Sequence, residues 1–254
     1  MAYKLLQYNP SPKPRPAPSH VKAVMTTRTG GHSLPPYDSL NLATHVGDDL
    51  DRVLANRALV AQALALPSEP CWINQVHGVR VLDVDSEACQ PIVDADGSAT
   101  SQANKVLAVL TADCLPVFIT NRSGSFIMLL HAGWRGVADD IISKSVRDCG
   151  QPSSELMAWI GPGIGKTAFE CGAEVRDEFL SNGTALPAHF QSIPSQENKF
   201  FGDLSSMAQW QCYQLGLAWV GASNECTYLN KQDFFSFRRE GVTGRMASFM
   251  WLTD

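Results

Sequence analysis

The sequence predicts an α/β fold in a single domain, because strand-like and helix-like segments alternate loosely along its 254 residues. Two short apolar runs, 106–110 and 126–130, are typical of buried β-strands. Longer segments combine a polar cap with an apolar face, which is typical of helices. We find no internal repeat, coiled-coil heptad or linker that would divide the chain into two domains.

The first segment of the chain is rich in proline. Prolines alternate with other residues from Pro10 to Pro18, which denies a helix its N–H donors and favours an extended, polyproline-like form. We expect residues 1–20 to be a lead-in that wraps the domain formed by residues 21–254. A ligand for a proline-binding protein is the alternative interpretation of this segment.

The first helix signal follows a pair of aspartates. Asp48 or Asp49 can cap a helix that stops before Pro67. Its expected apolar face consists of Leu50, Val53, Leu54 and Leu64. The next segment, 72–84, has the repeated valines of a β-strand.

Two more helices are predicted further along. One is expected over 137–149, with Gly150 at its end, because glycine commonly follows the last turn of a helix. For the other, Asp203 is the expected cap, and the helix should reach Leu215 and be closed by Gly216. With the strand runs, these helices complete the alternation that predicts the fold class.

Composition excludes several classes of protein. Hydrophobic residues make up 44% of the chain and the net charge is −5, whereas a nucleic-acid-binding protein usually carries a basic stripe. No apolar stretch approaches the roughly 20 residues that span a bilayer, and the N-terminal apolar core is too short for a secretory signal. Seven cysteines without paired spacing suit a reducing compartment better than a disulfide framework. We therefore expect a cytoplasmic enzyme, as a monomer or small homo-oligomer.

Three segments each carry one metal ligand beside residues that fill a core poorly. His77 precedes a glycine, Cys114 lies between an aspartate and a proline, and His131 opens a glycine-rich turn. Cys114 and His131 also follow the two apolar runs, so they should emerge where strands end. One thiolate and two imidazoles suit Zn²⁺ and leave a fourth position open for water or substrate, which is typical of a catalytic site.

The same residues also fit other chemistry. Cys114 with His77 or His131 could form the nucleophile and base of a cysteine hydrolase. A zinc-dependent hydrolase of a small cytosolic amide is a further alternative, and a non-catalytic binding protein is a third. Two imidazoles near one cysteine favour a metal over a dyad, which needs only one oriented base.

These segments resemble the signature motifs of a known family. Gln-Val-His-Gly at 75–78, Ala-Asp-Cys-Leu-Pro at 112–116 and His-Ala-Gly-Trp-Arg-Gly at 131–136 are similar to motifs of the laccase-domain family, also called the YfiH or polyphenol-oxidase-like family. The likeness extends to Thr-Thr-Arg at 26–28 and to Phe-Phe-Ser-Phe-Arg-Arg at 234–239, and covers nearly the whole chain.

The resemblance implies both a fold and an activity. The family fold is a mixed α/β one, with β-sheets packed centrally and helices outside. Its ligand set carries over to His77, Cys114 and His131 as zinc ligands. The implied activity is phosphorolysis of purine nucleosides, with adenosine deamination and methylthioadenosine cleavage at the same site.

A phosphorylase needs an anion site and a surface for the base. Arg135 follows a glycine at the start of the helix expected over 137–149, where free N–H groups favour an anion. The other arginines that we consider for phosphate are Arg28, Arg238 and Arg245. Trp134 or Phe235 could stack on a purine.

The remaining candidates are polar and acidic residues. His45 and Gln75 are expected to hydrogen-bond ribose or base. For proton transfer the sequence offers Asp113, Glu170 and Glu174, with Cys114 as the catalytic metal ligand or nucleophile. It gives no reason to prefer one acid strongly.

Two other functions are disfavoured by spacing. Gly161 and Gly165-Lys166-Thr167 resemble a phosphate-binding P-loop, but three residues separate the glycines where the motif needs four. A multicopper oxidase would need on the order of ten imidazoles, often in His-x-His pairs. The chain has six histidines, and no two are separated by a single residue. Copper could still occupy the His₂Cys site, but zinc is the expected metal.

Overall fold

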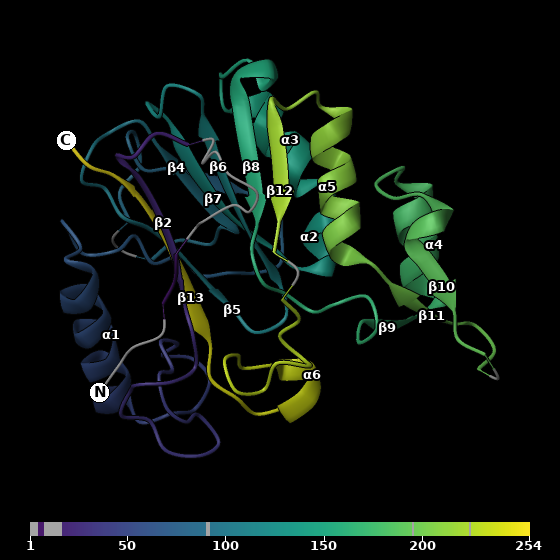
Figure 1. The fold of residues 1–254 in the computed structure, drawn as a ribbon, viewed down its shortest axis with the longest axis horizontal. Helices are drawn as coiled ribbons and strands as arrows, with labels where there is room; N and C mark the ends of the chain where they lie inside the picture. Colours follow the sequence, from purple (N-terminus) through teal and green to yellow (C-terminus); the bar gives the residue numbers. More distant parts are fainter. Residues whose placement is uncertain (1–4, 8–16, 90–91, 195, 224) are drawn as a thin grey trace.

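Two β-sheets packed face to face form the centre of the molecule, and helices cover their outer faces (Figure 1). Figure 1 is a computed structural model that describes residues 5–7, 17–89, 92–194, 196–223 and 225–254. The larger sheet has six strands in the order β12, β8, β6, β7, β4 and β3. Their bounds are Trp219–Ala222, Leu156–Ile160, Leu115–Asn121, Ile127–Ala132, Gly97–Thr100 and Val81–Asp83.

The second sheet has four strands in the order β1, β2, β13 and β5. These strands comprise Leu5–Gln7, Val21–Thr26, Met246–Leu252 and Leu107–Thr111. Strand β13 near the C-terminus pairs with both β2 and β5, so the two ends of the described chain meet in this sheet. All pairings within it are antiparallel, whereas the six-stranded sheet is mixed.

The central strands β5, β6 and β7 are mostly apolar because both faces of the sheets are covered. In β5, Leu107 and Val109 face the six-stranded sheet and pack with its residues. The alternate residues Ala108 and Leu110 belong to a different cluster, which packs against the helix α1 (Leu50–Leu64). A strand buried on both faces shows a continuous apolar run rather than alternation, which explains the runs seen in the sequence. The predicted arrangement of central sheets and outer helices is confirmed.

Helix α1 begins and ends as predicted, but its buried face differs. The Asp49 side chain caps it by accepting a hydrogen bond from the backbone N–H of Arg52, at 3.1 Å. Val53 is buried as expected, whereas Leu50 and Leu54 are 55% and 49% exposed. The other buried residues of the helix are Asn56 and Val60. The prediction was wrong for the two leucines. Asn56 lies on the buried side of the helix and donates hydrogen bonds to Ser33, Ser39 and Asn41 of the preceding loop, so the side that carries the leucines faces solvent.

The single helix predicted over 137–149 is two helices. α2 (Trp134–Ala138) starts earlier than expected, and α3 (Ile141–Asp148) follows after a break at Asp140, which has a left-handed backbone with φ of 67°. Both helices cover the outer face of the six-stranded sheet together with α5 (Leu204–Gln214). The prediction for α5 is confirmed, with Asp203 as its cap.

One expectation for this region was wrong, and two features of it were not predicted. Segment 72–84 forms a strand only in β3, because the chain turns at His77, where φ is 61°. Strand β6 was missed because Pro116 resembles a loop residue, yet it lies at the second position of this strand. Proline is tolerated at the start of a strand, where its missing N–H is not needed. Cys71 and Cys89 form a disulfide, which the 18-residue separation did not reveal.

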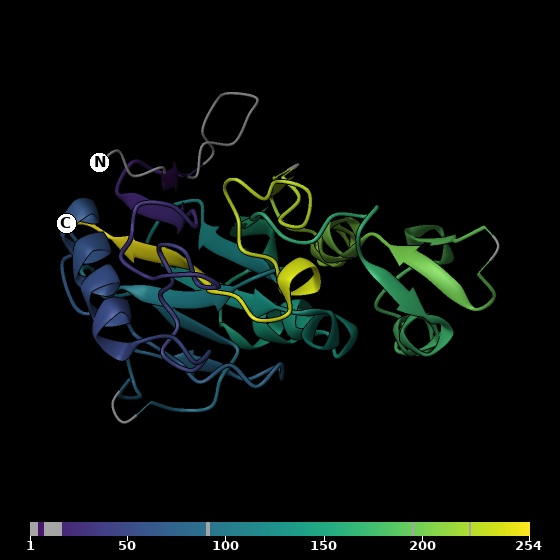
Figure 2. The same cartoon turned by 90° about the horizontal axis from the view of Figure 1, so that it is seen from below.

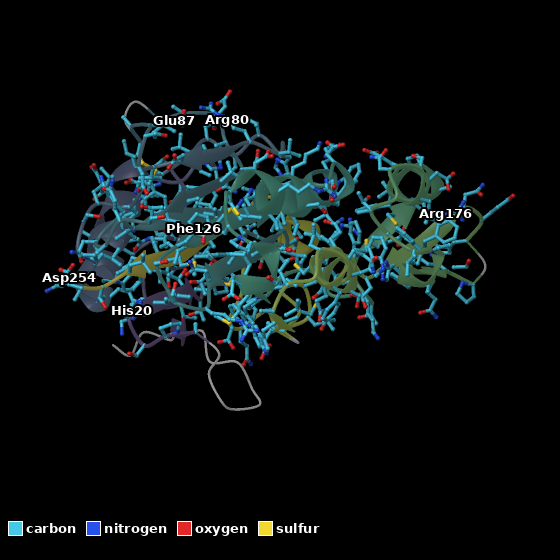
Figure 3. The ribbon with its side chains drawn as sticks, turned by 90° about the horizontal axis from the view of Figure 1, so that it is seen from above. His20, Arg80, Glu87, Phe126, Arg176 and Asp254 are labelled. Carbon is cyan, nitrogen blue, oxygen red and sulfur yellow. A yellow bond between two sulfur atoms is a disulfide. The ribbon has the colours of Figure 1, made fainter. Side chains whose placement is uncertain are left out.

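A smaller unit projects from the side of the two central sheets (Figure 2). It is a three-stranded sheet in the order β10, β11 and β9, with helix α4 packed against it. Its elements are Phe190–Ser192, Lys199–Gly202, Glu170–Gly172 and Ala173–Ser181. Figure 3 places Arg176 of α4 well away from Phe126, which lies on the central sheet. The last helix, α6 (Phe237–Glu240), lies between this unit and the four-stranded sheet.

The predicted lead-in falls mostly outside the described residues, which omit 1–4 and 8–16. Among the helices that are described, none has the length and apolar content needed to cross a bilayer.

Candidate metal centre

The three predicted ligands meet at one point. His77 lies in the loop before β3, Cys114 directly precedes β6, and His131 is the penultimate residue of β7. Their ligand atoms all lie within 4.8 Å of one another. The Cys114 Sγ atom is 3.9 Å from Nε2 of His77, and the two imidazole rings meet edge to face with centroids 4.9 Å apart. Segments that are far apart in sequence thus form one donor set.

A carboxylate that the sequence analysis missed holds this set together. Asp96 is completely buried and accepts four hydrogen bonds. Its Oδ1 atom accepts one hydrogen bond from Nδ1 of His131, at 2.8 Å, and one from the backbone N–H of His77, at 2.9 Å. Its Oδ2 atom accepts hydrogen bonds from the backbone N–H groups of Val76, at 3.2 Å, and Gly78, at 2.7 Å. Asp96 therefore fixes both the ring of one histidine and the backbone of the other.

The charges in the site favour a preformed thiolate. Burial by itself would raise the pKa of the Cys114 thiol, but His131 and His77 beside it lower the pKa to about 6. Burial would likewise lower the pKa of His131, whereas the Cys114 thiolate and the Asp96 carboxylate raise it to about 9. Sulfur binds metals as the thiolate, so the ligand form of Cys114 exists at neutral pH.

The donor set fits a metal ion. Because Nδ1 of His131 is bonded to Asp96, Nε2 is the nitrogen that a metal would bind, by displacing the proton that the raised pKa keeps there at neutral pH; a histidine held by a carboxylate in this way recurs in zinc sites. A Cβ atom at Gly133 would lie 2.9 Å from the His77 ring and 3.0 Å from Cys114 Sγ, so only glycine leaves the ligands where they are. Two nitrogens and one sulfur, with a fourth side open, suit zinc in a catalytic site.

A pocket of about 280 Å³ opens over the cysteine. His77 and Cys114 line its floor, and two cations, Arg135 and Arg238, lie at its wall. The rest of the lining is mostly apolar and consists of Ala112, Asp113, Trp134, Ile164, Phe169, Leu204 and Phe237. The pocket therefore combines an open metal-ligand set, positive charge and aromatic surface.

The model of the family described as multi-copper polyphenol oxidoreductase laccase matches residues 22–253. The chain belongs to this laccase-domain family.

Other laccase-domain proteins resemble it over nearly their whole length. A purine nucleoside phosphorylase YfiH of Shigella flexneri is 42% identical over 93% of this chain and 96% of its own. Its Escherichia coli counterpart of the same name is 41% identical over the same shares. The crystal structure of Neisseria meningitidis protein NMB0706 has a TM-score of 0.91 at 38% identity and covers 98% of this chain and 99% of its own.

The two arginines of the pocket were both predicted from the sequence. The side chain of Arg135 is exposed, and its guanidinium lies 4.4 Å from the centroid of the Trp134 ring. Arg238 donates to the backbone oxygens of Ala168 at 3.2 Å and Glu170 at 2.9 Å through one nitrogen, Nη1. Both cations thus border the metal ligands of this laccase-domain site, and their contact with phosphate stays a prediction.

Asp113 lines the pocket but is occupied by structural bonds. Its Oδ1 atom accepts from the Thr227 hydroxyl and its Oδ2 atom from the backbone N–H of Arg238, each at 2.7 Å. Gln75 is similarly committed, because its amide bonds both the N–H and the C=O of Leu110 at 2.8 Å. Proton transfer by Asp113 and substrate binding by Gln75 stay predictions, and each would have to compete with these bonds.

Other candidates lie outside the pocket. Arg28 forms an ion pair with Glu240 at 2.6 Å and packs over Phe235, 4.6 Å from its centroid. Phe235 is completely buried, so its predicted stacking on a purine is wrong. Glu170 on β9 lies 3.7 Å from Lys199.

The last candidates are also at the surface. Glu174 is exposed on α4. His45 is exposed in a loop near Arg245 and Arg57, and burial together with these two charges lowers its pKa. For His45, as for Arg28, Glu170 and Glu174, the proposed roles stay predictions.

Sequence reasoning missed two residues of the site. Asp96 is separated from His131 by 35 positions, and its only signal is an acidic residue directly before a glycine that starts a strand of small residues. Phe237 lies in a run of three phenylalanines, and the sequence does not tell which of them is exposed. The structure resolves this, since Phe234 and Phe235 are buried and Phe237 is 58% exposed.

Proposed function

We propose that this protein is a zinc-dependent purine nucleoside phosphorylase. Adenosine, inosine and methylthioadenosine would react with phosphate to give the free base and the sugar 1-phosphate. The observation that carries the proposal is a His–Cys–His set of which His77 and Cys114 line a pocket that also holds two arginines. The names of the Shigella and Escherichia coli relatives support the same reaction.

The residues have separate tasks in this reaction. His77, Cys114 and His131 would hold the zinc, which when bound supplies a Lewis acid at the pocket floor. Arg135 and Arg238 would bind phosphate, since guanidinium groups match its oxygens in pairs. A phosphate oxygen then forms the bond to C1′ of the sugar, while the glycosidic bond breaks with its electron pair leaving on the base.

The fixed geometry of the ligands supports catalysis rather than simple binding. Asp96 keeps the Nδ1 proton of His131, so this imidazole presents the same nitrogen throughout the reaction. The apolar side chains of the wall would limit the water around a bound sugar, which favours transfer to phosphate over hydrolysis.

Adenosine deamination is a side reaction in this proposal. Among the described residues, Asp113 is the one carboxylate that lines the pocket, and both its oxygens accept hydrogen bonds. We therefore expect deamination to be slower than phosphorolysis. On the sequence features, we also propose that the reaction takes place in the cytoplasm.

A thiol hydrolase is the second candidate, and one observation favours it. Cys114 lies beside His131, whose Nδ1 is bonded to the Asp96 carboxylate, and cysteine hydrolases use a thiol, an imidazole and an orienting group in this order. His77 is evidence against a thiol hydrolase, because a second imidazole 3.9 Å from the same sulfur is not needed in a cysteine–histidine dyad.

Product analysis separates these activities. Adenosine, inosine and methylthioadenosine are incubated with zinc-loaded or chelated protein, with and without phosphate. We expect base and sugar 1-phosphate only when zinc and phosphate are both present. A thiol hydrolase would instead survive chelation and release free ribose without phosphate, and a zinc amidase would ignore both phosphate and nucleosides. Absence of phosphate-dependent base release from all three substrates would refute the proposal.

The Cys114→Ala variant ties the activity to the metal. We expect elemental analysis to find about one zinc per wild-type chain and little in this variant, because a two-imidazole site lacks the thiolate that zinc prefers. Cys149→Ala is the matched control, since Cys149 is a free, partly exposed cysteine directly after α3 that does not line this pocket. Full zinc retention in Cys114→Ala would remove the cysteine from the ligand set.

A further inference from the structure

We propose that Phe237 is the platform on which the purine base stacks. The inference rests on the proposed function and deepens it, because it assigns the part of the site that selects a planar heteroaromatic base. Phe237 lines the same pocket as His77 and Cys114, so a nucleoside bound over the cysteine would share that pocket with its side chain.

The exposure of Phe237 is the first reason. Its side chain is 58% exposed, although the two residues before it, Phe235 and Ser236, are completely buried. A large aromatic ring left in water at the mouth of a polar site is surface that a ligand can cover. Because Phe234 and Phe235 of the same segment are buried, this segment lies next to the core. The exposure of Phe237 therefore comes from its own place in the segment.

The ring is carried by a backbone that is fixed on both sides. The Ser236 hydroxyl accepts a hydrogen bond from the N–H of Arg239 at 3.2 Å and caps the short helix α6. Directly after Phe237, the N–H of Arg238 donates to Asp113 at 2.7 Å. The Arg245 guanidinium packs on the ring, 5.7 Å from its centroid. A preorganised platform loses little entropy when a base stacks on it.

The other aromatic residue of the pocket is less available. Trp134 is only half-exposed, and the Arg135 guanidinium lies 4.4 Å from its centroid. With a volume of about 280 Å³, the pocket is at the small end for a ligand site, which suits one nucleoside rather than a polymer. Trp134 lines the same pocket, and Phe237 is the more exposed of the two rings, with its cation farther from the ring centroid.

Substitutions at Phe237 test the platform in the zinc-loaded enzyme. We expect Phe237→Ala to raise the KM for adenosine by about 10-fold to 100-fold, the range for removing one aromatic ring from a stacked base. The KM for phosphate should change by less than about 2-fold, because the arginines are untouched. Phe237→Tyr and Phe237→Trp should retain most of the affinity, whereas Phe237→Leu keeps the apolar bulk and should lose most of it.

Tyr213→Ala is the matched control, since Tyr213 on α5 is also 58% exposed but does not line this pocket. Thermal melting checks that all variants fold. An unchanged adenosine KM in Phe237→Ala, or wild-type affinity in Phe237→Leu, would overturn the platform.

Equilibrium binding separates this inference from the proposed function. Isothermal titration of adenosine and adenine into wild-type and Phe237→Ala protein needs no turnover. Binding that is weakened in the variant supports the platform even if the wild type releases no base. Phosphorolysis that proceeds equally well in both proteins overturns the platform and leaves the function standing. If wild-type protein binds neither compound, the platform is wrong.

Discussion

Replacing Asp96 with asparagine tests whether one carboxylate assembles the metal ligands. Each of its oxygens accepts two hydrogen bonds: Oδ1 from His131 and the His77 backbone, and Oδ2 from the Val76 and Gly78 backbones. An asparagine side chain has only one acceptor oxygen. In either orientation its NH₂ group therefore meets two donors, and if that group faces His131, the imidazole must change tautomer.

The magnitude follows from this count. Two hydrogen bonds to a charged acceptor are lost, each worth about 1.5–3 kcal/mol, so the free energy of unfolding of the metal-free protein should fall by about 3 kcal/mol or more. Zinc affinity should fall by about 10-fold to 100-fold, the range seen when a residue that hydrogen-bonds a metal ligand is replaced. Both losses should appear together because one carboxylate serves the fold and the ligands.

The assay is competition for zinc with a coloured chelator, alongside urea unfolding of the metal-free proteins. Asp94→Asn is the matched control, because Asp94 is exposed and lies two positions away. Its side chain accepts a hydrogen bond from Asn74 and does not touch the metal ligands in any described contact. We expect it to change zinc affinity by less than about 2-fold. A folded Asp96→Asn variant with wild-type zinc affinity would refute the role assigned to this carboxylate.

Two further predictions concern charge. Arg135→Lys should raise the KM for phosphate by about 10-fold and more than the KM for nucleoside, because an ammonium cannot match two phosphate oxygens. Equal effects on both substrates, or the same effect from Arg147→Lys on α3, would contradict this. At Glu240, burial raises the pKa, but bonds from Thr243, Arg28 and Ser236 lower it from 4.5 to about 2. The stability from this carboxylate is therefore present above pH 4.5 and lost as the pH falls toward 2. After allowance for solvent screening it amounts to about 2 kcal/mol, and Glu240→Gln should flatten the decline of urea stability in that window. If the stability of Glu240→Gln declines between pH 4.5 and 2 as steeply as that of the wild type, the prediction is contradicted.

The sequence could predict the elements whose signals are local. The cap at Asp49 and the cap at Asp203 are set by residues within one turn, and both were found. The break between α2 and α3 was not, because the left-handed Asp140 has no glycine or proline to mark it. Strand β6 was missed for the opposite reason, since Pro116 carries a loop signal that the sheet tolerates at a strand start. Tertiary context decided both positions.

The candidate site divides in the same way. The ligands were predictable because His77, Cys114 and His131 lie in short motifs with glycine or proline beside them. Asp96 was not, because its partners are separated from it by up to 35 positions and a lone aspartate has no distinctive spacing. The exposure of Phe237 depends on how α6 is fixed to Asp113, which is a contact across 125 positions. Residues that act through long-range hydrogen bonds leave little trace in sequence.

The two buried carboxylates near the pocket also bear on the choice of reaction. Asp96 ties the loop of His77 to β7, and Asp113 ties α6 to the segment that carries Cys114. All four of their oxygens accept hydrogen bonds, so neither carboxylate can take a proton from a substrate without competing with these bonds, as a free general base could. Deamination and general-base hydrolysis need such a group. Phosphorolysis needs a bound phosphate anion, which the two pocket arginines can hold, together with a metal site. The way these carboxylates are used therefore favours transfer to phosphate over the hydrolytic alternatives.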